Sequence, residues 1–148
     1  MGTYFTKKQV SESLGISLRT VQYYTDEGLL IPEIANPSGR GTSRKYSKKN
    51  LAEFLIIKEL AKYGLSLWQI KGIMEKARSS DVAKKWDPEG KWAQRKRSRP
   101  RLVIYGLGTE DMKVQMEEEG PRLLSKLYGH RAALVIDVED IFIQIDEL

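Results

Sequence analysis

The sequence contains no cysteine and a single histidine, His130, among its 148 residues. Without cysteine there is no disulfide framework, no thiolate metal site and no cysteine nucleophile. One histidine also leaves a histidine-based metal site or a Ser-His-Asp triad with little to build on. We therefore expect no metal, no other cofactor and no enzymatic activity.

Long apolar runs are absent as well. No stretch approaches the roughly 20 residues that span a bilayer, and the N-terminal sequence MGTYFTKKQV has no apolar segment of the signal-peptide type. The 41% apolar and 30% charged residues are typical of a soluble globular protein. We expect a cytoplasmic protein without membrane contact, built as one domain of ordinary size or two small ones.

The charge is unevenly distributed along the chain. The net charge is +5, but residues 1–100 hold 20 Lys and Arg against 10 Asp and Glu, whereas residues 101–148 hold 5 against 10. This asymmetry predicts a basic region that meets a polyanion and an acidic region with another role. The alternative is chance clustering of charge on solvated faces.

Two short helices are predicted near the N-terminus. Thr6 and Gln9 have the spacing of a capping box. Val10 and Leu14 then lie on one helical face. Gly15 permits a sharp turn, after which Ser17 is placed to cap a second helix.

The second helix has two distinct faces and ends before Gly28, which is placed as a C′ glycine. Its inward face is predicted to carry Leu18, Val21 and Tyr24 or Thr25. Its outward face carries Arg19, Gln22, Tyr23 and Asp26. A tight two-helix hairpin with a polar outer face is typical of a helix-turn-helix.

A hairpin and a helix pair follow. Residues 31–34 are expected to be extended because Pro32 stops a helix. Residues 36–43 form a loop by composition and residues 44–46 a return strand, which together resemble a wing with Arg40, Arg44 and Lys45 near its tip. One helix is then predicted from Ser47 to Gly64, and the Ser66–Gln69 capping box opens another through Ala77.

The remainder of the chain changes character. Residues 79–100 read as a basic linker or arm, with six cations and no acid from Lys91 to Arg101. Residues 101–148 predict a small acidic α+β module for effector binding or dimerisation. Its expected elements are a strand over 102–105, a helix capped by Thr109, a second helix with Leu123, Leu124 and Leu127, and strands over 132–137 and 141–145.

The outward face of the second helix suits the major groove, where base edges are read by hydrogen bonds and methyl contacts. Arg19 can bind a phosphate or a guanine edge, and Gln22 can pair with adenine. Tyr23 can donate a hydrogen bond to a phosphate, and Thr20 adds a hydroxyl. The alternative for this face is an ordinary solvated helix surface.

The segments LGISLRTVQYYTDEGLLIP, RKYS and YGLSLWQIKGIM, in this order, resemble the N-terminal DNA-binding domain of the MerR family over residues 4–76. The resemblance implies a mainly α fold, with a winged helix-turn-helix and a following helix pair. It implies a homodimer that binds double-stranded promoter DNA. It also implies that the dimer bends and untwists the promoter spacer, which realigns the two promoter elements for RNA polymerase. The DNA contacts that it implies fall on Arg19, Tyr23, Arg44 and Tyr46.

This chain departs from the family pattern in three ways. Gln22 stands where members usually have an arginine, and the wing loop is longer and richer in Pro, Ser and Gly. After Met74 only about a dozen helix-compatible residues precede Asp87-Pro88, which is short for the family's dimer helix. The missing cysteines exclude a thiolate sensor of metal or redox state.

Other candidate features name no ligand. Gly106-Leu107-Gly108 lacks the third glycine of a phosphate loop, so a structural turn is favoured. Trp68, Trp86 and Trp92 could wall an effector pocket or pack in a core or interface. Glu117-Glu118-Glu119 is expected on a solvated helix face. The sequence thus predicts a DNA-binding transcriptional regulator with an unknown small-molecule effector; the alternative is a DNA-bending architectural protein in recombination or chromosome organisation.

Overall fold

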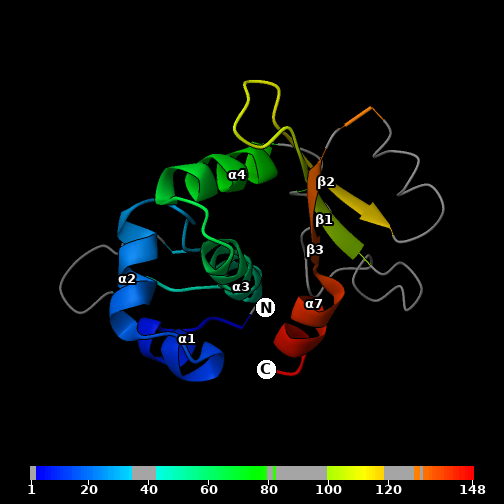
Figure 1. Cartoon of the computed structure of the whole chain (residues 1–148). Helices are drawn as coiled ribbons and strands as arrows, with labels where there is room; N and C mark the ends of the chain where they lie inside the picture. The colour runs from blue at the N-terminus through cyan, green and yellow to red at the C-terminus, as the bar shows by residue number, and fades with distance from the viewer. Residues whose placement is uncertain (1–2, 35–42, 80–81, 83–99, 119–128, 131) are drawn as a thin grey trace.

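The computed structural model describes residues 3–34, 43–79, 82, 100–118, 129–130 and 132–148. Within these residues it is rich in helix and contains one small antiparallel sheet (Figure 1). The helices are α1 (Lys7–Leu14), α2 (Leu18–Asp26), α3 (Lys48–Lys62), α4 (Leu67–Ser79) and α7 (Glu139–Asp146). The strands are β1 (Pro100–Tyr105), β2 (Lys113–Glu118) and β3 (Ala133–Asp137).

The starts of α1 and α2 are fixed by local side chains, as predicted. The Thr6 hydroxyl accepts from the Gln9 backbone N–H at 3.2 Å, and the Gln9 carbonyl oxygen accepts from the Thr6 N–H at 2.8 Å. Gly15 ends α1 with φ +64°, a conformation that L side chains rarely adopt. Ser17 then accepts from the Thr20 N–H at 3.1 Å, so the two helices are joined by a tight, capped turn.

The end of α2 is equally well defined. Gly28 has φ +75°, and its N–H donates to the Thr25 carbonyl at 3.0 Å. The Leu29 N–H donates to the Tyr24 carbonyl, also at 3.0 Å. These two bonds form a Schellman motif, which turns the chain so that Leu29 enters the core with none of its surface exposed.

The described ends of the wing segment are paired with neighbouring backbone. Ile34 and Lys45 exchange hydrogen bonds of 3.1 and 3.2 Å, and Phe5 and Tyr46 exchange bonds of 2.8 and 2.9 Å. The expected extended segment and return strand therefore meet in one isolated antiparallel bridge, at Ile34 and Lys45, and a second bridge joins the return strand to Phe5. Residues 36–42 of the predicted loop lie outside the described residues, as does Arg40.

Asn50 fastens this segment to α3. Its side-chain oxygen accepts from the backbone N–H groups of Ser47 and Glu33 at 3.1 and 3.0 Å. Its amide nitrogen donates to the Ile31 carbonyl at 2.9 Å. Because Asn50 is buried and satisfied on both ends of its amide, it fixes where the chain that follows α2 lies against α3.

The core is continuous from the N-terminal helices to the C-terminal sheet. Helix α3 is its centre: from Asn50 to Ile57 every residue is buried. Helices α1, α4 and α7 contact α3, and β2 contacts α4 (Figure 1). A helix that is buried on nearly all sides has to be covered from several directions, and the C-terminal elements supply part of that cover.

The sheet has the order β2-β1-β3, with both neighbours antiparallel to β1. Tyr105 is opposite Lys113 on β2 and Ala133 on β3. Leu102 and Ile104 join the core shared with the helices, while Val103 and Tyr105, on the other face, are buried as well. The predicted strands over 102–105 and 132–137 are confirmed.

Three expectations for the C-terminal region are wrong. Thr109 does not cap a helix: its hydroxyl donates to the Gly106 carbonyl at 2.7 Å in a turn, and β2 follows. Residues 141–145 are not a strand but part of α7, because Ile141, Phe142 and Ile145 are buried at helical spacing. Glu117 lies on β2 and is buried, so it is not on a solvated helix face.

The predicted second C-terminal helix with Leu123, Leu124 and Leu127 falls outside the described residues, as does nearly all of the predicted linker. The prediction that Leu18 lies on the inward face of α2 is wrong, because this residue is 45% exposed. Among the described residues no helix combines the length and apolar character that crossing a membrane requires.

Candidate nucleic-acid interface

The outward face of α2 is exposed, as the helical periodicity predicts. Arg19, Gln22, Tyr23 and Asp26 are all solvent-exposed, whereas Val21 and Thr25 are buried against the core. Thr20 is half-buried, and its hydroxyl lies 2.8 Å from the Ser17 hydroxyl. Thr20 therefore supports the start of the helix. The donors available to a ligand come from Arg19, Gln22 and Tyr23, whereas Asp26 offers only acceptor oxygens.

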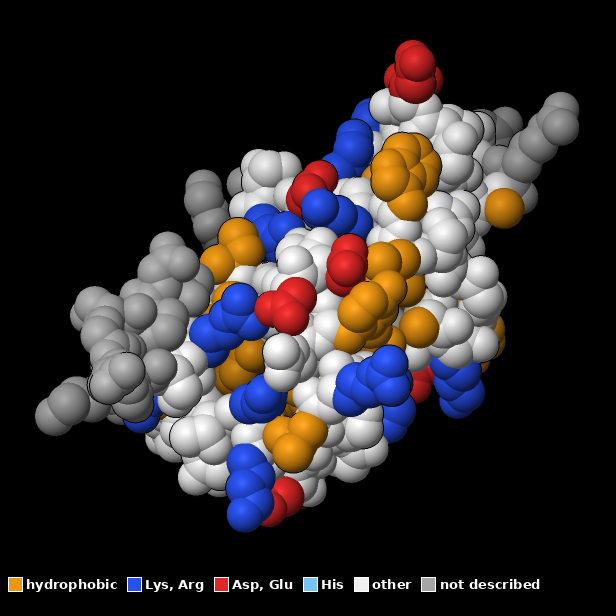
Figure 2. All heavy atoms as spheres, turned by 90° about the vertical axis from the view of Figure 1, so that its left-hand side faces the viewer, with side chains coloured by type: hydrophobic (Ala, Val, Ile, Leu, Met, Phe, Trp, Pro, Cys, Tyr) orange, Lys and Arg blue, Asp and Glu red, His pale blue; other side chains and the backbone are white. Residues whose placement is uncertain are grey.

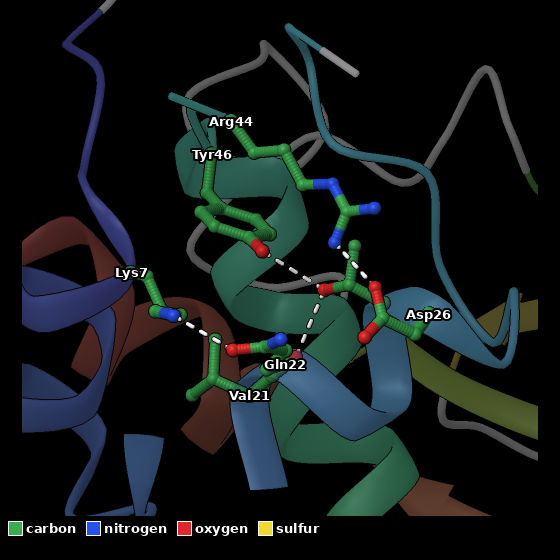
Figure 3. A network of polar contacts seen from close by, with 7 residues as sticks. Lys7, Val21, Gln22, Asp26, Arg44 and Tyr46 are labelled. Carbon is green, nitrogen blue, oxygen red and sulfur yellow. Dashed lines mark hydrogen bonds and ion pairs between the residues drawn. The ribbon is translucent and has the colours of Figure 1, made fainter. Parts of the chain in front are cut away.

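A chain of polar contacts links this face to α1 and to the segment that precedes α3 (Figure 3). The Lys7 ammonium donates to the Gln22 side-chain oxygen at 2.8 Å. One turn further along α2, the Asp26 carboxylate accepts from the Arg44 guanidinium at 2.6 Å. We call Lys7, Gln22, Asp26 and Arg44 the α2 polar network.

The electrostatics of Asp26 reflect these neighbours. The hydrogen bond from Arg44 is the main reason that the pKa of the Asp26 carboxyl lies below its usual value, and Gln22 and Lys7 act in the same direction. Asp26 therefore stays ionised at neutral pH and holds a cation that the sequence pattern assigned to DNA. The side chains of Arg44 and Asp26 are 41% and 46% exposed, so the pair is open to competition from a ligand.

Tyr46 is a correction to the predicted contact set. Its side chain is 1% exposed, and its ring packs against Phe54 with centroids 5.4 Å apart. Its hydroxyl lies 2.9 Å from the Thr25 hydroxyl, which itself donates to the Val21 carbonyl. The Thr25 proton is thereby committed, so Tyr46 donates to Thr25 and supports α2 from within the core rather than facing a ligand.

Cations are spread over the side of the molecule that carries α2. Figure 2, turned so that this side faces the viewer, shows Lys and Arg side chains across it, with hydrophobic and a few acidic side chains between them. Lys45 is exposed next to the wing segment. A face with scattered cations and exposed rings such as Tyr23 can bind phosphates at several points along a duplex.

Two of the remaining sequence candidates in the described part of the chain, Trp68 and the turn at Gly106-Leu107-Gly108, border the same open hollow. Gly106 and Gly108 both have positive φ and belong to the turn between β1 and β2. Trp68 is 81% exposed and borders an open hollow of about 520 Å³ between α4 and that turn. Trp86 and Trp92 lie outside the described residues. The ring of His130 packs on Tyr105 with centroids 4.6 Å apart.

Comparison with known proteins identifies the domain to which α2 belongs. The family model described as MerR HTH family regulatory protein matches residues 5–77, which hold α1 to α3 and all of α4 except its last two residues. This chain carries a MerR-family helix-turn-helix domain. The resemblance drawn from its sequence motifs is confirmed.

Curated relatives also match part of the chain. Three proteins described as uncharacterized HTH-type transcriptional regulators, one from Mycobacterium bovis and two from strains of Mycobacterium tuberculosis, are each 32% identical over 68 residues. The match covers 46% of this chain and 30% of each relative. The chain thus spans less than a third of the length of these relatives.

Two members of the α2 polar network are not among the predicted site residues. Lys7 belongs to α1, and its contact with Gln22 brings it to the outward face of α2. Asp26 is placed on the outward face by its spacing, but its partner Arg44 is 18 residues away in the sequence. Helical periodicity gives the direction of a side chain, whereas a contact between elements requires their packing.

Proposed function

We propose that this protein is a sequence-specific DNA-binding transcriptional regulator whose MerR-type domain inserts α2 into the major groove. The observation that carries the proposal is the exposed outer face of α2, with Arg19, Gln22 and Tyr23 on a helix fixed at both ends. A rigid helix of this kind can present hydrogen-bond donors to base edges without first being ordered.

The exposed residues divide into two proposed roles. Arg19 and Gln22 face outward from the helix and suit base edges, since arginine matches guanine and glutamine matches adenine. Tyr23, Arg44 and Lys45 suit phosphates, which fix the position of the helix on the duplex. Affinity that rests on phosphates falls steeply as salt rises.

We further propose that the protein acts as a homodimer on a near-palindromic promoter site. The dimer distorts the DNA between the half-sites, which realigns the promoter elements for RNA polymerase. Support comes from the MerR-type domain and from relatives described as transcriptional regulators.

A footprint of the purified protein on its source DNA tests the function, and one discrete protected site beside a promoter is the expected result. Broad, even protection would favour an architectural protein instead. On the protected site, Arg19→Ala should weaken binding by about 1–3 kcal/mol and relax the sequence preference. Lys113→Ala removes an exposed charge from β2 and serves as the control, with binding expected to stay close to wild type.

A loss for Arg19→Ala that is equal on the protected site and on scrambled DNA would assign Arg19 to a phosphate. Unchanged binding to both DNAs would overturn the proposed docking of α2.

A further inference from the structure

An acidic side chain stands on the face that is proposed to meet DNA. Asp26 lies one turn after Gln22 on the outer face of α2 and is exposed. A carboxylate at such a position repels the phosphate backbone and lowers affinity for every DNA sequence. A solvated helix surface alone does not explain why a carboxylate occupies this position.

The partner of Asp26 supplies that account. The Arg44 guanidinium donates to the Asp26 carboxylate at 2.6 Å, and Arg44 is also a proposed phosphate contact. A carboxylate and a phosphate offer a guanidinium the same kind of charged oxygen acceptor. Arg44 thus has two alternative partners that compete for one charge.

Resting on the function proposed above, we propose that Asp26 acts as an intramolecular substitute for a DNA phosphate. It holds Arg44 in the DNA-free protein, and a phosphate displaces it when DNA binds. Arg44 lies just before α3 and Asp26 near the end of α2, so the contact also joins the wing segment to the recognition helix until DNA arrives.

This substitution has a cost that can be measured. Breaking an exposed ion pair takes about 0.2–1 kcal/mol, so the affinity for DNA falls by roughly 1.4-fold to fivefold. The cost is the same for all sequences because a phosphate, not a base, displaces Asp26. Asp26 therefore limits non-specific binding. At the specific site, base contacts have to make up for the affinity that is lost when the ion pair breaks.

The test titrates a labelled duplex of random sequence, at low salt, with five full-length proteins. These are the wild type, Asp26→Asn, Arg44→Gln, the Asp26→Asn/Arg44→Gln double variant, and Glu27→Gln. Glu27 is exposed next to Asp26, so its variant removes the same charge from the same end of α2 without freeing Arg44. Circular dichroism of each protein checks that it is folded.

Asp26→Asn should bind the duplex about threefold more tightly than wild type, and Glu27→Gln should gain less. In the Arg44→Gln background the gain from Asp26→Asn should shrink to that of Glu27→Gln. An equal gain with and without Arg44 would overturn the proposal in favour of simple charge repulsion. Weaker binding by Asp26→Asn would also overturn it, because Asp26 would then position Arg44 for DNA.

The wild-type titration separates this proposal from the proposed function. A wild-type protein that binds no duplex would overturn the proposed function itself. A wild-type protein that binds, with variants that show no coupling between Asp26 and Arg44, would overturn only the role of Asp26.

Discussion

The two ends of the chain share one core but present different chemistry to solvent. The N-terminal helices expose a network of charged and amide groups on α2, while β1 is buried on both faces and α7 turns its apolar side inward. The charge follows the same division, with an excess of cations over residues 1–100 and of acids over residues 101–148. The basic end is thus equipped to meet a polyanion, and the acidic end to cover the core.

This difference means that DNA binding and the stability of the fold depend on different side chains. The α2 polar network lies at the surface, where ion pairs contribute little to folding. The free energy of unfolding depends instead on contacts such as those between α7 and α3 and between β2 and α4. Substitutions in the two regions should therefore have separable effects on DNA binding and on stability.

The largest expected effect is in α7. Ile145 is fully buried, and Ile145→Ala should lower the free energy of unfolding by about 3 kcal/mol because it leaves a cavity in the shared core. Ile143 lies on the same helix but is 54% exposed. Ile143→Ala is therefore the control, with an expected change within about 0.5 kcal/mol. Urea unfolding followed by circular dichroism measures both.

Hydrogen exchange shows whether the core is one cooperative unit. Ile145→Ala should speed the exchange of amides in α3 as well as in α7. If only α7 amides exchanged faster, the two ends of the chain would unfold as separate units and would not share one cooperative core.

A buried carboxyl lies where the two ends meet. Glu53 is 5% exposed and borders a cavity of about 20 Å³ between α3, α4 and β1. Burial raises the pKa of Glu53, although a hydrogen bond from Asn50 and the charge of Arg78 oppose the shift. The native state therefore holds this proton more tightly than the unfolded chain, and stability falls as the pH rises above about 4.5, the ordinary value for the group.

Glu53→Gln should remove this fall and raise stability at pH 7 by about 1 kcal/mol, since the amide keeps an acceptor for Asn50 but carries no charge. Thermal melts between about pH 4 and pH 8 measure the effect. Glu59→Gln removes the same charge from the same helix and is expected to change stability by no more than about 0.5 kcal/mol. A Glu53→Gln protein with the wild-type pH dependence would contradict the role given to burial.

The last prediction tests whether Tyr46 supports α2 from within the core or contacts DNA. Tyr46→Phe removes the hydroxyl that donates to Thr25, and the loss of one buried hydrogen bond should cost about 1 kcal/mol of stability. DNA affinity should stay at the wild-type value when the protein is fully folded. A drop in affinity without a drop in stability would return Tyr46 to the set of DNA contacts.

The sequence is sufficient where structure is decided locally. The helix starts at Thr6, Ser17, Ser47 and Ser66 are all predictable, because a cap involves residues only three apart. The direction of Val21 and Gln22 follows from the helical period for the same reason. The family motif covers this region, and residue spacing alone locates the outward face of α2.

The sequence is insufficient where distant segments decide. Residues 113–116 alternate between exposed and buried positions, with Val114 and Met116 inside, but the acidic residues around them favour a helix and β1 has to supply the pairing. Tyr46 carries a family signal for DNA contact, yet its burial depends on Phe54 and Thr25. The competition for Arg44 is hidden in the sequence because Asp26 is separated from it by the whole wing segment.

The backbone bridge between Ile34 and Lys45 bears on how this domain tolerates change in length. The two hydrogen bonds close the chain at the base of the wing segment, so residues added between these positions do not alter the path of α2 or α3. Doubling the length of a closed loop costs only about 0.6 kcal/mol of closure entropy. Insertions here should therefore alter the reach along a duplex while the recognition helix keeps its place.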